Sequence, residues 1–169
     1  MRITLFTGDI TDAPAEAICT STNARLSLMM GTGGAVRERG GFEVLRACEK
    51  IVAESGRGAL PAGTAYATTA GSLPYKAAIH CIASDPKTHL SSEALIQRCV
   101  TNALARADAL HCASVAMPVF ATGHARFKFE RAIEAMLAAL RAAATQVEHV
   151  VIVVHEPRQA DDVRRILAA

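Results

Sequence analysis

The sequence predicts an α/β fold, namely a three-layer α/β/α sandwich around a central mixed, mostly parallel sheet. Strand-like segments alternate with helical ones along the chain, which favours helices packed on both faces of one sheet. The last strand-like segment, residues 149–154, is an almost unbroken β-branched run, as expected of a strand that is covered on both faces. With 169 residues, of which 51% are hydrophobic, the chain is expected to form one domain with a full core.

Each element follows from its local pattern. Short apolar stretches predict the strands, whereas a helix over 42–55 brings Val44 and Cys48 to one face. A helix over 92–110 begins with Ser92 as its N-cap, and the glycine-rich stretch near residue 31 opens a further helix. The expected strands span residues 2–6, 15–19, 64–70, 77–82, 114–119 and 149–154, and the other expected helices span 129–144 and 159–168.

Charge and hydropathy narrow the classes of partner. The chain has 18 basic and 16 acidic residues and no polybasic run, so nucleic acid is not an expected partner. No apolar stretch reaches the roughly 18 residues that a membrane span needs, so no membrane partner is expected either. The N-terminal residues 1–6 have the pattern of a strand and not of a signal peptide.

The five cysteines indicate a reducing compartment. Their number is odd and none forms a CxxC pair, so we expect reduced, mostly structural thiols and a cytoplasmic protein. No cluster of residues has the spacing of a zinc site, so no metal is expected. The cysteines are Cys19, Cys48, Cys81, Cys99 and Cys112.

Three loops follow predicted strands, at residues 7–11, 22–36 and 121–124. In an α/β sheet, ligands bind beyond the carboxyl ends of the strands, where these loops would meet. The second loop contains Gly31 and Gly33 at the start of a helix, where unpaired backbone amides favour a phosphate. The three loops together predict a site for a ligand with a base at one end and phosphates in its middle.

Several polar residues in the first two loops have both a structural and a functional interpretation. Asp9 either caps a turn or accepts a hydrogen bond from the exocyclic amine of a base, whose ring nitrogen the Ile10 amide could bind. Asn23 either forms a turn or holds a ribose hydroxyl or a water. His80 lies inside an apolar strand, where a structural role is expected.

The third loop is rich in small residues that allow a backbone to approach an anion. Gly123 permits this approach, and Thr122 could add a hydroxyl donor. His124 is either an exposed loop residue or a general acid or phosphate contact, and Arg126 is either a phosphate partner or a surface charge. His155, directly after the last strand, either stacks on a base or belongs to a loop.

Five segments in order resemble the macro domain family, which binds ADP-ribose. Residues 8–11 match the family's GDIT segment, and residues 15–23 are similar to its "DAIVNAAN" strand and loop. Residues 30–36 resemble the glycine-rich phosphate loop, and residues 63–80 resemble the stretch from "G-A-x-x-T" to "I-H". Residues 117–123 are similar to "F-P-x-I-S-T-G".

The resemblance implies a single macro domain over residues 1–169 that binds ADP-ribose, free or attached to a protein, without a metal or redox cofactor. Asp9 and Ile10 would contact adenine, and Asn23 would lie near the distal ribose. The remaining implied positions are Gly31, Thr32 and Gly33 around one phosphate, Thr122, Gly123 and His124 around the diphosphate with Ala125 and Arg126, Phe127 in place of an aromatic residue over the distal ribose, and His155 beside the adenine.

Departures from the family pattern leave the activity open. Hydrolytic members carry an aspartate at the position of Gly33, and another catalytic set needs a second-loop aspartate where this chain has Ala125. The first asparagine of "NAAN" is replaced by Thr20. The chain is therefore either a binding module or an ADP-ribosyl hydrolase or O-acetyl-ADP-ribose deacetylase, in which Asn23 would position a water and His124 would be the candidate acid. A third alternative is a domain for another nucleotide or an RNA end. The sequence does not indicate the oligomeric state.

Overall fold

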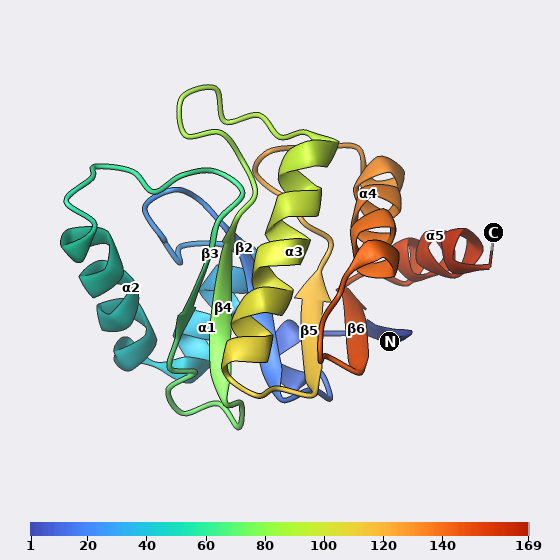
Figure 1. The fold of residues 1–169 in the computed structure, drawn as a ribbon, viewed down its shortest axis with the longest axis horizontal. Coiled ribbons are helices and arrows are strands. Elements are labelled where there is room, and N and C mark those ends of the chain that lie inside the picture. The colour runs from blue at the N-terminus through green and yellow to red at the C-terminus, as the bar shows by residue number, and fades with distance from the viewer. Residues whose placement is uncertain (169) are drawn as a thin grey trace.

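The computed structural model describes residues 1–168, which form one six-stranded sheet with helices on both faces (Figure 1). The strands lie in the order β1-β6-β5-β2-β4-β3, and every neighbouring pair is parallel except β3 with β4. The expected mixed, mostly parallel sheet is therefore confirmed. The strands are β1 (Arg2–Thr7), β2 (Ala17–Thr22), β3 (Ala65–Thr68), β4 (Ala77–Ile82), β5 (Ser114–Pro118) and β6 (His149–Val154).

Within residues 1–168, four α-helices and a 3-10 turn lie between the strands, a fifth α-helix follows β6, and the helices divide between the two faces. The helices are α1 (Gly31–Gly40), α2 (Phe42–Glu54), α3 (Glu93–Ala109), α4 (Phe129–Ala142) and α5 (Pro157–Leu167), and the 3-10 turn is η1 (Ile10–Asp12). In Figure 1, α3 lies in front of the strands and α1 behind them. None of the helices within residues 1–168 has the length and apolar character needed to cross a membrane.

Side chains that alternate along the strands belong to two separate hydrophobic cores, one on each face of the sheet. On β2, Cys19 belongs to the core that also contains buried residues of α3, α4 and α5, whereas Ile18 belongs to the core with buried residues of α1 and α2. On β6, Ile152 and Val151 divide in the same way between the two cores. This alternation confirms three layers, because both faces of the parallel strands are buried under helices.

Most expected elements agree with the structure to within one or two residues, and β2 is the main exception. We expected this strand at residues 15–19, but it spans Ala17–Thr22. Its polar end pairs in register with β4, with Thr20 opposite His80 and Thr22 opposite Ile82. The strand continues because the neighbouring strand supplies hydrogen-bond partners, which the local sequence does not reveal.

The junction between α1 and α2 is fixed by two glycines. The Ser72 amide donates to the Gly40 carbonyl at 2.9 Å. A Cβ atom at Gly71, where φ is +61°, would lie only 1.9 Å from the same oxygen. This close backbone contact holds the carboxyl end of α1 against the loop that follows β3.

Candidate functional site

The carboxyl ends of β2, β5 and β6 open onto a cleft of about 850 Å³. Asn23 follows β2, the segment 121–126 follows β5, and His155 follows β6, and all of them line this cleft. The three strands are neighbours in the sheet, so chain segments more than 100 residues apart meet here. Such a crevice is where parallel α/β sheets place their ligands.

The first turn of α1 supplies unpaired donors to the cleft. Met30 is the N-cap residue but makes no capping hydrogen bond with its side chain, and the first helical bond runs from the Gly34 amide to the Met30 carbonyl at 3.0 Å. The amides of residues 31–33 therefore have no backbone partner within residues 1–168. Gly31 and Thr32 line the cleft, so the positive end of the helix dipole faces it.

The loop between β2 and α1 is held by the Asn23 side chain and by buried leucines. The Asn23 Oδ1 atom accepts hydrogen bonds from the amides of Arg25 at 3.0 Å and Ser27 at 3.2 Å. Leu26 and Leu28 are fully buried beneath the loop. Asn23 thus serves as a turn former, while its Nδ2 group has no hydrogen bond within residues 1–168 and can donate to a ligand.

The loop after β5 forms the opposite wall of the cleft. Ala121 has a φ of +65°, an uncommon conformation for a residue with a side chain. The Phe127 amide donates to the Ala121 carbonyl at 3.0 Å, which closes the loop, and a Cβ atom at Gly123 would meet only open space. The Thr122 hydroxyl donates to the Val119 carbonyl at 2.9 Å, so its proton is already used within the loop.

Four of the residues implied by the resemblance lie outside the lining of the cleft. Gly33 is buried, and a Cβ atom there would lie 3.2 Å from Leu28 Cδ2 rather than in the cleft. Phe127 packs against the core on the α3 and α4 side, with the Arg131 guanidinium 5.8 Å from its ring centroid. It is therefore turned toward the core and not toward the cleft.

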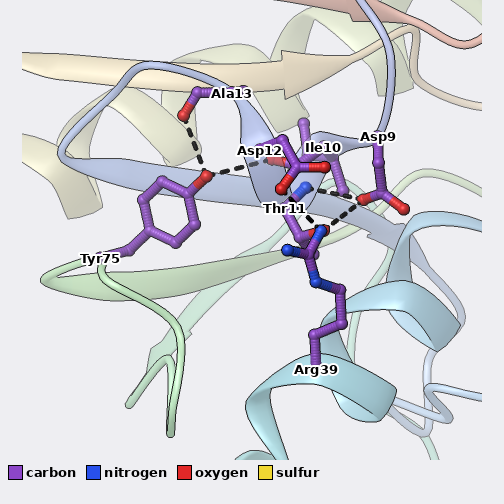
Figure 2. Close-up of polar contacts among 7 residues, drawn as sticks. All are labelled: Asp9, Ile10, Thr11, Asp12, Ala13, Arg39 and Tyr75. Atoms are coloured by element: carbon purple, nitrogen blue, oxygen red, sulfur yellow. Dashed lines mark hydrogen bonds and ion pairs between the residues drawn. The ribbon is translucent and has the colours of Figure 1, made fainter.

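The other two, Asp9 and Ile10, lie in the turn after β1 (Figure 2). The Gly8 amide donates to the Val154 carbonyl at 2.9 Å, which places this turn beside the cleft residues at the end of β6. Asp9 caps η1 by accepting a hydrogen bond from the Thr11 amide at 2.8 Å. The turn therefore lies at the margin of the cleft, next to His155.

The Asp9 carboxyl is kept ionised by its surroundings. Partial burial raises its pKa, but the hydrogen bonds from Thr11 and the charges of Arg39 and His155 outweigh this effect. The pKa of Asp9 therefore lies below its ordinary value. At neutral pH the carboxylate is an acceptor only, as the amine of a base would require.

Residues that the sequence analysis did not assign to the site also line the cleft. Ser84 follows β4, and Met29 and Met30 precede α1 with exposed fractions of 67% and 72%. The loop that continues from Ser84 brings His89 to His124, with ring centroids 6.0 Å apart in an edge-to-face arrangement. Ser84 is the first polar residue after a buried strand, and this position was the available signal.

His80 has the structural role that its position on a strand predicted. It is fully buried, with Nδ1 2.9 Å from Thr20 Oγ1 and Nε2 2.8 Å from Thr68 Oγ1. Thr68 donates its one hydroxyl proton to the Thr69 carbonyl at 2.9 Å, so His80 donates from Nε2 and accepts at Nδ1. Burial lowers the pKa of His80 to about 4, which keeps this imidazole neutral.

The fold and the site together define an α/β domain with a cleft at the carboxyl edge of its sheet, into which the start of a helix opens. The chain belongs to the macro domain family, because the family model described as "Macro domain" matches residues 19–136. The resemblance drawn from the sequence motifs is thereby confirmed.

Relatives and solved structures agree with this assignment. A macro domain-containing protein of Streptomyces coelicolor is 33% identical over 157 residues, which cover 92% of each chain. An O-acetyl-ADP-ribose deacetylase of Escherichia fergusonii is 33% identical over 81% of this chain and 76% of its own. A solved structure of the Oceanobacillus iheyensis macrodomain, a glycine-to-valine mutant with ADPR, superposes with a TM-score of 0.88 at 25% identity and covers 97% of this chain and 90% of that one.

Proposed function

We propose that this chain binds ADP-ribose, free or as an ADP-ribosyl group on a protein, in the cleft beyond β2, β5 and β6. The observation that supports this most directly is the first turn of α1, because Gly31 and Thr32 line the cleft and their amides have no backbone partner within residues 1–168. The loop 121–126 presents backbone from the opposite wall. Two such loops around one cleft suit the two phosphates of a diphosphate.

The two ends of the cleft suit the two ends of this ligand. Asp9, Ile10 and His155 would contact the adenine, because the ionised Asp9 turn lies next to His155. Asn23 would donate from Nδ2 to the distal ribose. A volume of about 850 Å³ lies within the usual range of small-molecule sites. The solved relative described with ADPR supports the same choice of ligand.

Isothermal titration with ADP-ribose, with AMP and ADP as controls, tests this proposal. We expect micromolar or tighter binding of ADP-ribose and weaker binding of AMP, which lacks the second phosphate and the distal ribose. Absence of binding would refute the proposed ligand.

A pair of substitutions at Gly31 tests the role of α1. The position tolerates a side chain in space, because a Cβ atom there meets nothing within 4 Å, and its φ of +58° is one that Asp and Asn adopt. Gly31→Asp should weaken binding more than roughly tenfold, since like charges in contact cost on the order of several kcal/mol. Gly31→Asn is the matched neutral control. Equal affinities of the two variants would show that no phosphate binds at this helix start.

Hydrolysis of an ADP-ribosyl or O-acetyl-ADP-ribose substrate is a second candidate function. The E. fergusonii relative named as a deacetylase favours it, and both candidate catalytic residues, Asn23 and His124, line the cleft. Asn23 would donate to a water, and the exposed His124 would exchange protons. Turnover of either substrate that falls in His124→Ala would support this function. Turnover unaffected by the substitution would exclude His124, and tight binding without turnover would leave a binding module.

The sequence and the burial of its cysteines support a proposal for the domain organisation, the compartment and the partner of this protein. We propose a single macro domain over residues 1–169 that acts in the cytoplasm, because all five cysteines are buried and unpaired. The formal net charge of +2 supports a small molecule or a modified protein as partner rather than nucleic acid. RNA binding that weakens steeply with salt would contradict this choice.

A further inference from the structure

Three side chains form a line of hydrogen bonds that ends at Asp9 (Figure 2). Arg39 donates from Nη1 to Thr11 Oγ1, and Thr11 Oγ1 donates to Asp9 Oδ1. The Thr11 amide donates to the same Oδ1 atom at 2.8 Å. Within residues 1–168, nothing donates to Oδ2 of Asp9. The carboxylate is therefore fixed through Oδ1, and Oδ2 is left as an acceptor without a donor from these residues.

Arg39 determines which way the Thr11 hydroxyl points. A hydroxyl has one proton, and a guanidinium only donates, so the contact with Arg39 occupies a lone pair of Oγ1 and directs the proton to Asp9. The donor is charged, and linked hydrogen bonds polarise one another, which strengthens the contact at the carboxylate. Arg39 thus acts on Asp9 through the buried Thr11.

Stability alone does not account for this arrangement. Arg39 also pairs with Asp12, with Nη1 2.8 Å from Oδ1, but the two side chains are 46% and 54% exposed. Such exposed pairs contribute little to folding. The turn is held independently from its other side, where the Tyr75 hydroxyl donates to the Ala13 carbonyl at 2.9 Å.

We propose that Arg39 is a positioning residue for the adenine end of the ligand: through Thr11 it holds the Asp9 carboxylate so that Oδ2 receives the exocyclic amine of the base. This role rests on the proposed function. Arg39 lies near the end of α1, whose first turn would bind the diphosphate, so one helix of 10 residues serves both ends of the ligand.

Two ligands that differ only at the base provide the test. Inosine diphosphate ribose carries a carbonyl where ADP-ribose carries the amine, so the native protein should bind ADP-ribose more tightly. Arg39→Gln should weaken ADP-ribose binding roughly tenfold and change binding of the inosine ligand by less than about twofold, as expected when only a charge-assisted contact to the amine is lost. Arg46→Gln, which removes the same charge from an exposed site on α2, should change neither.

Thr11→Val extends the test to the connecting residue. It removes the hydroxyl but keeps the backbone contact to Asp9, so it should reduce the preference for ADP-ribose in the same way. Combining it with Arg39→Gln should cause no further loss. Equal weakening of both ligands, unchanged affinities, or additive losses would each overturn the proposal. If the native protein binds neither ligand, the proposed function fails first, and this role fails with it.

Discussion

Acidification should destabilise this fold through one buried imidazole. His80 is fully buried between Thr20 and Thr68, and burial lowers its pKa to about 4. In the unfolded chain an imidazole takes up its proton at about pH 6.5. Because the unfolded state binds the proton first, the free energy of unfolding falls as the pH drops from about 7 to about 4.

The size of this effect follows from the two pKa values. At pH 5 the unfolded imidazole is almost fully protonated, while the folded one is protonated in about a tenth of the molecules. Integrating between the two titrations gives a loss of about 2 kcal/mol relative to pH 8, at about 1.4 kcal/mol per pKa unit. Protonation at Nδ1 would also remove the acceptor of the Thr20 hydroxyl.

Urea unfolding between pH 8 and pH 5 measures this loss. The native sequence should lose about 2 kcal/mol more than His80→Gln, which carries no titrating group at this position. His149, whose pKa is also lowered by partial burial and by Arg2, titrates in both proteins and cancels in the comparison. Thr68→Val, which retains the imidazole, should keep the fall. Parallel pH dependences of the native protein and His80→Gln would refute the reasoning.

Three further substitutions or reactions test the site and the packing. Asp9→Asn keeps the acceptor for Thr11 but replaces Oδ2 by an amide NH2 group, which cannot accept from the adenine amine. Calorimetry should therefore show a roughly tenfold loss of ADP-ribose affinity. An unchanged affinity would place adenine elsewhere. Gly71→Ala should lower the free energy of unfolding by about 2 kcal/mol or more, given the 1.9 Å approach to the Gly40 oxygen. Gly58→Ala, with open space around it, should leave the stability nearly unchanged. Equal melting temperatures of the Gly58→Ala and Gly71→Ala variants would contradict the close contact at Gly71. Thiol reagents should label the folded protein far more slowly than the unfolded one, because all five cysteines are buried and burial raises the pKa of Cys48 to about 12. Fast labelling of the folded protein would contradict the burial of the cysteines.

Strands with strong apolar patterns were predictable from the sequence, and boundaries set by other segments were not. The strands at 77–82 and 149–154 have the expected bounds, because six successive residues of each carry the pattern. Helix α5 begins at Pro157 rather than at the expected residue 159. Glu156 and Gln159 form a reciprocal cap around its first turn, and Pro at the first helical position suits the fixed backbone angle there.

The glycine-rich loops marked the place of the site, but the direction of single side chains depended on tertiary contacts. Gly31 and Gly123 lie at the cleft as their backbone freedom suggested. Phe127 turns toward the core because that face offers apolar contacts, which adjacent residues in the chain do not indicate. The approach of His89 to His124 depends on two loops that are far apart in the sequence.

The position of β6 in the sheet has a consequence for how the protein is made. This strand is the last to be synthesised, yet it lies between β1 and β5 and pairs with both. Until the ribosome has released residues 149–154, the first strand has no neighbour and His155 is not in place. Contacts between segments that are far apart in the sequence form late, because closing a long loop costs entropy before any pairing compensates for it. A nascent chain therefore acquires this cleft only after β6 has left the ribosome, and ligand binding would distinguish chains that include β6 from shorter ones.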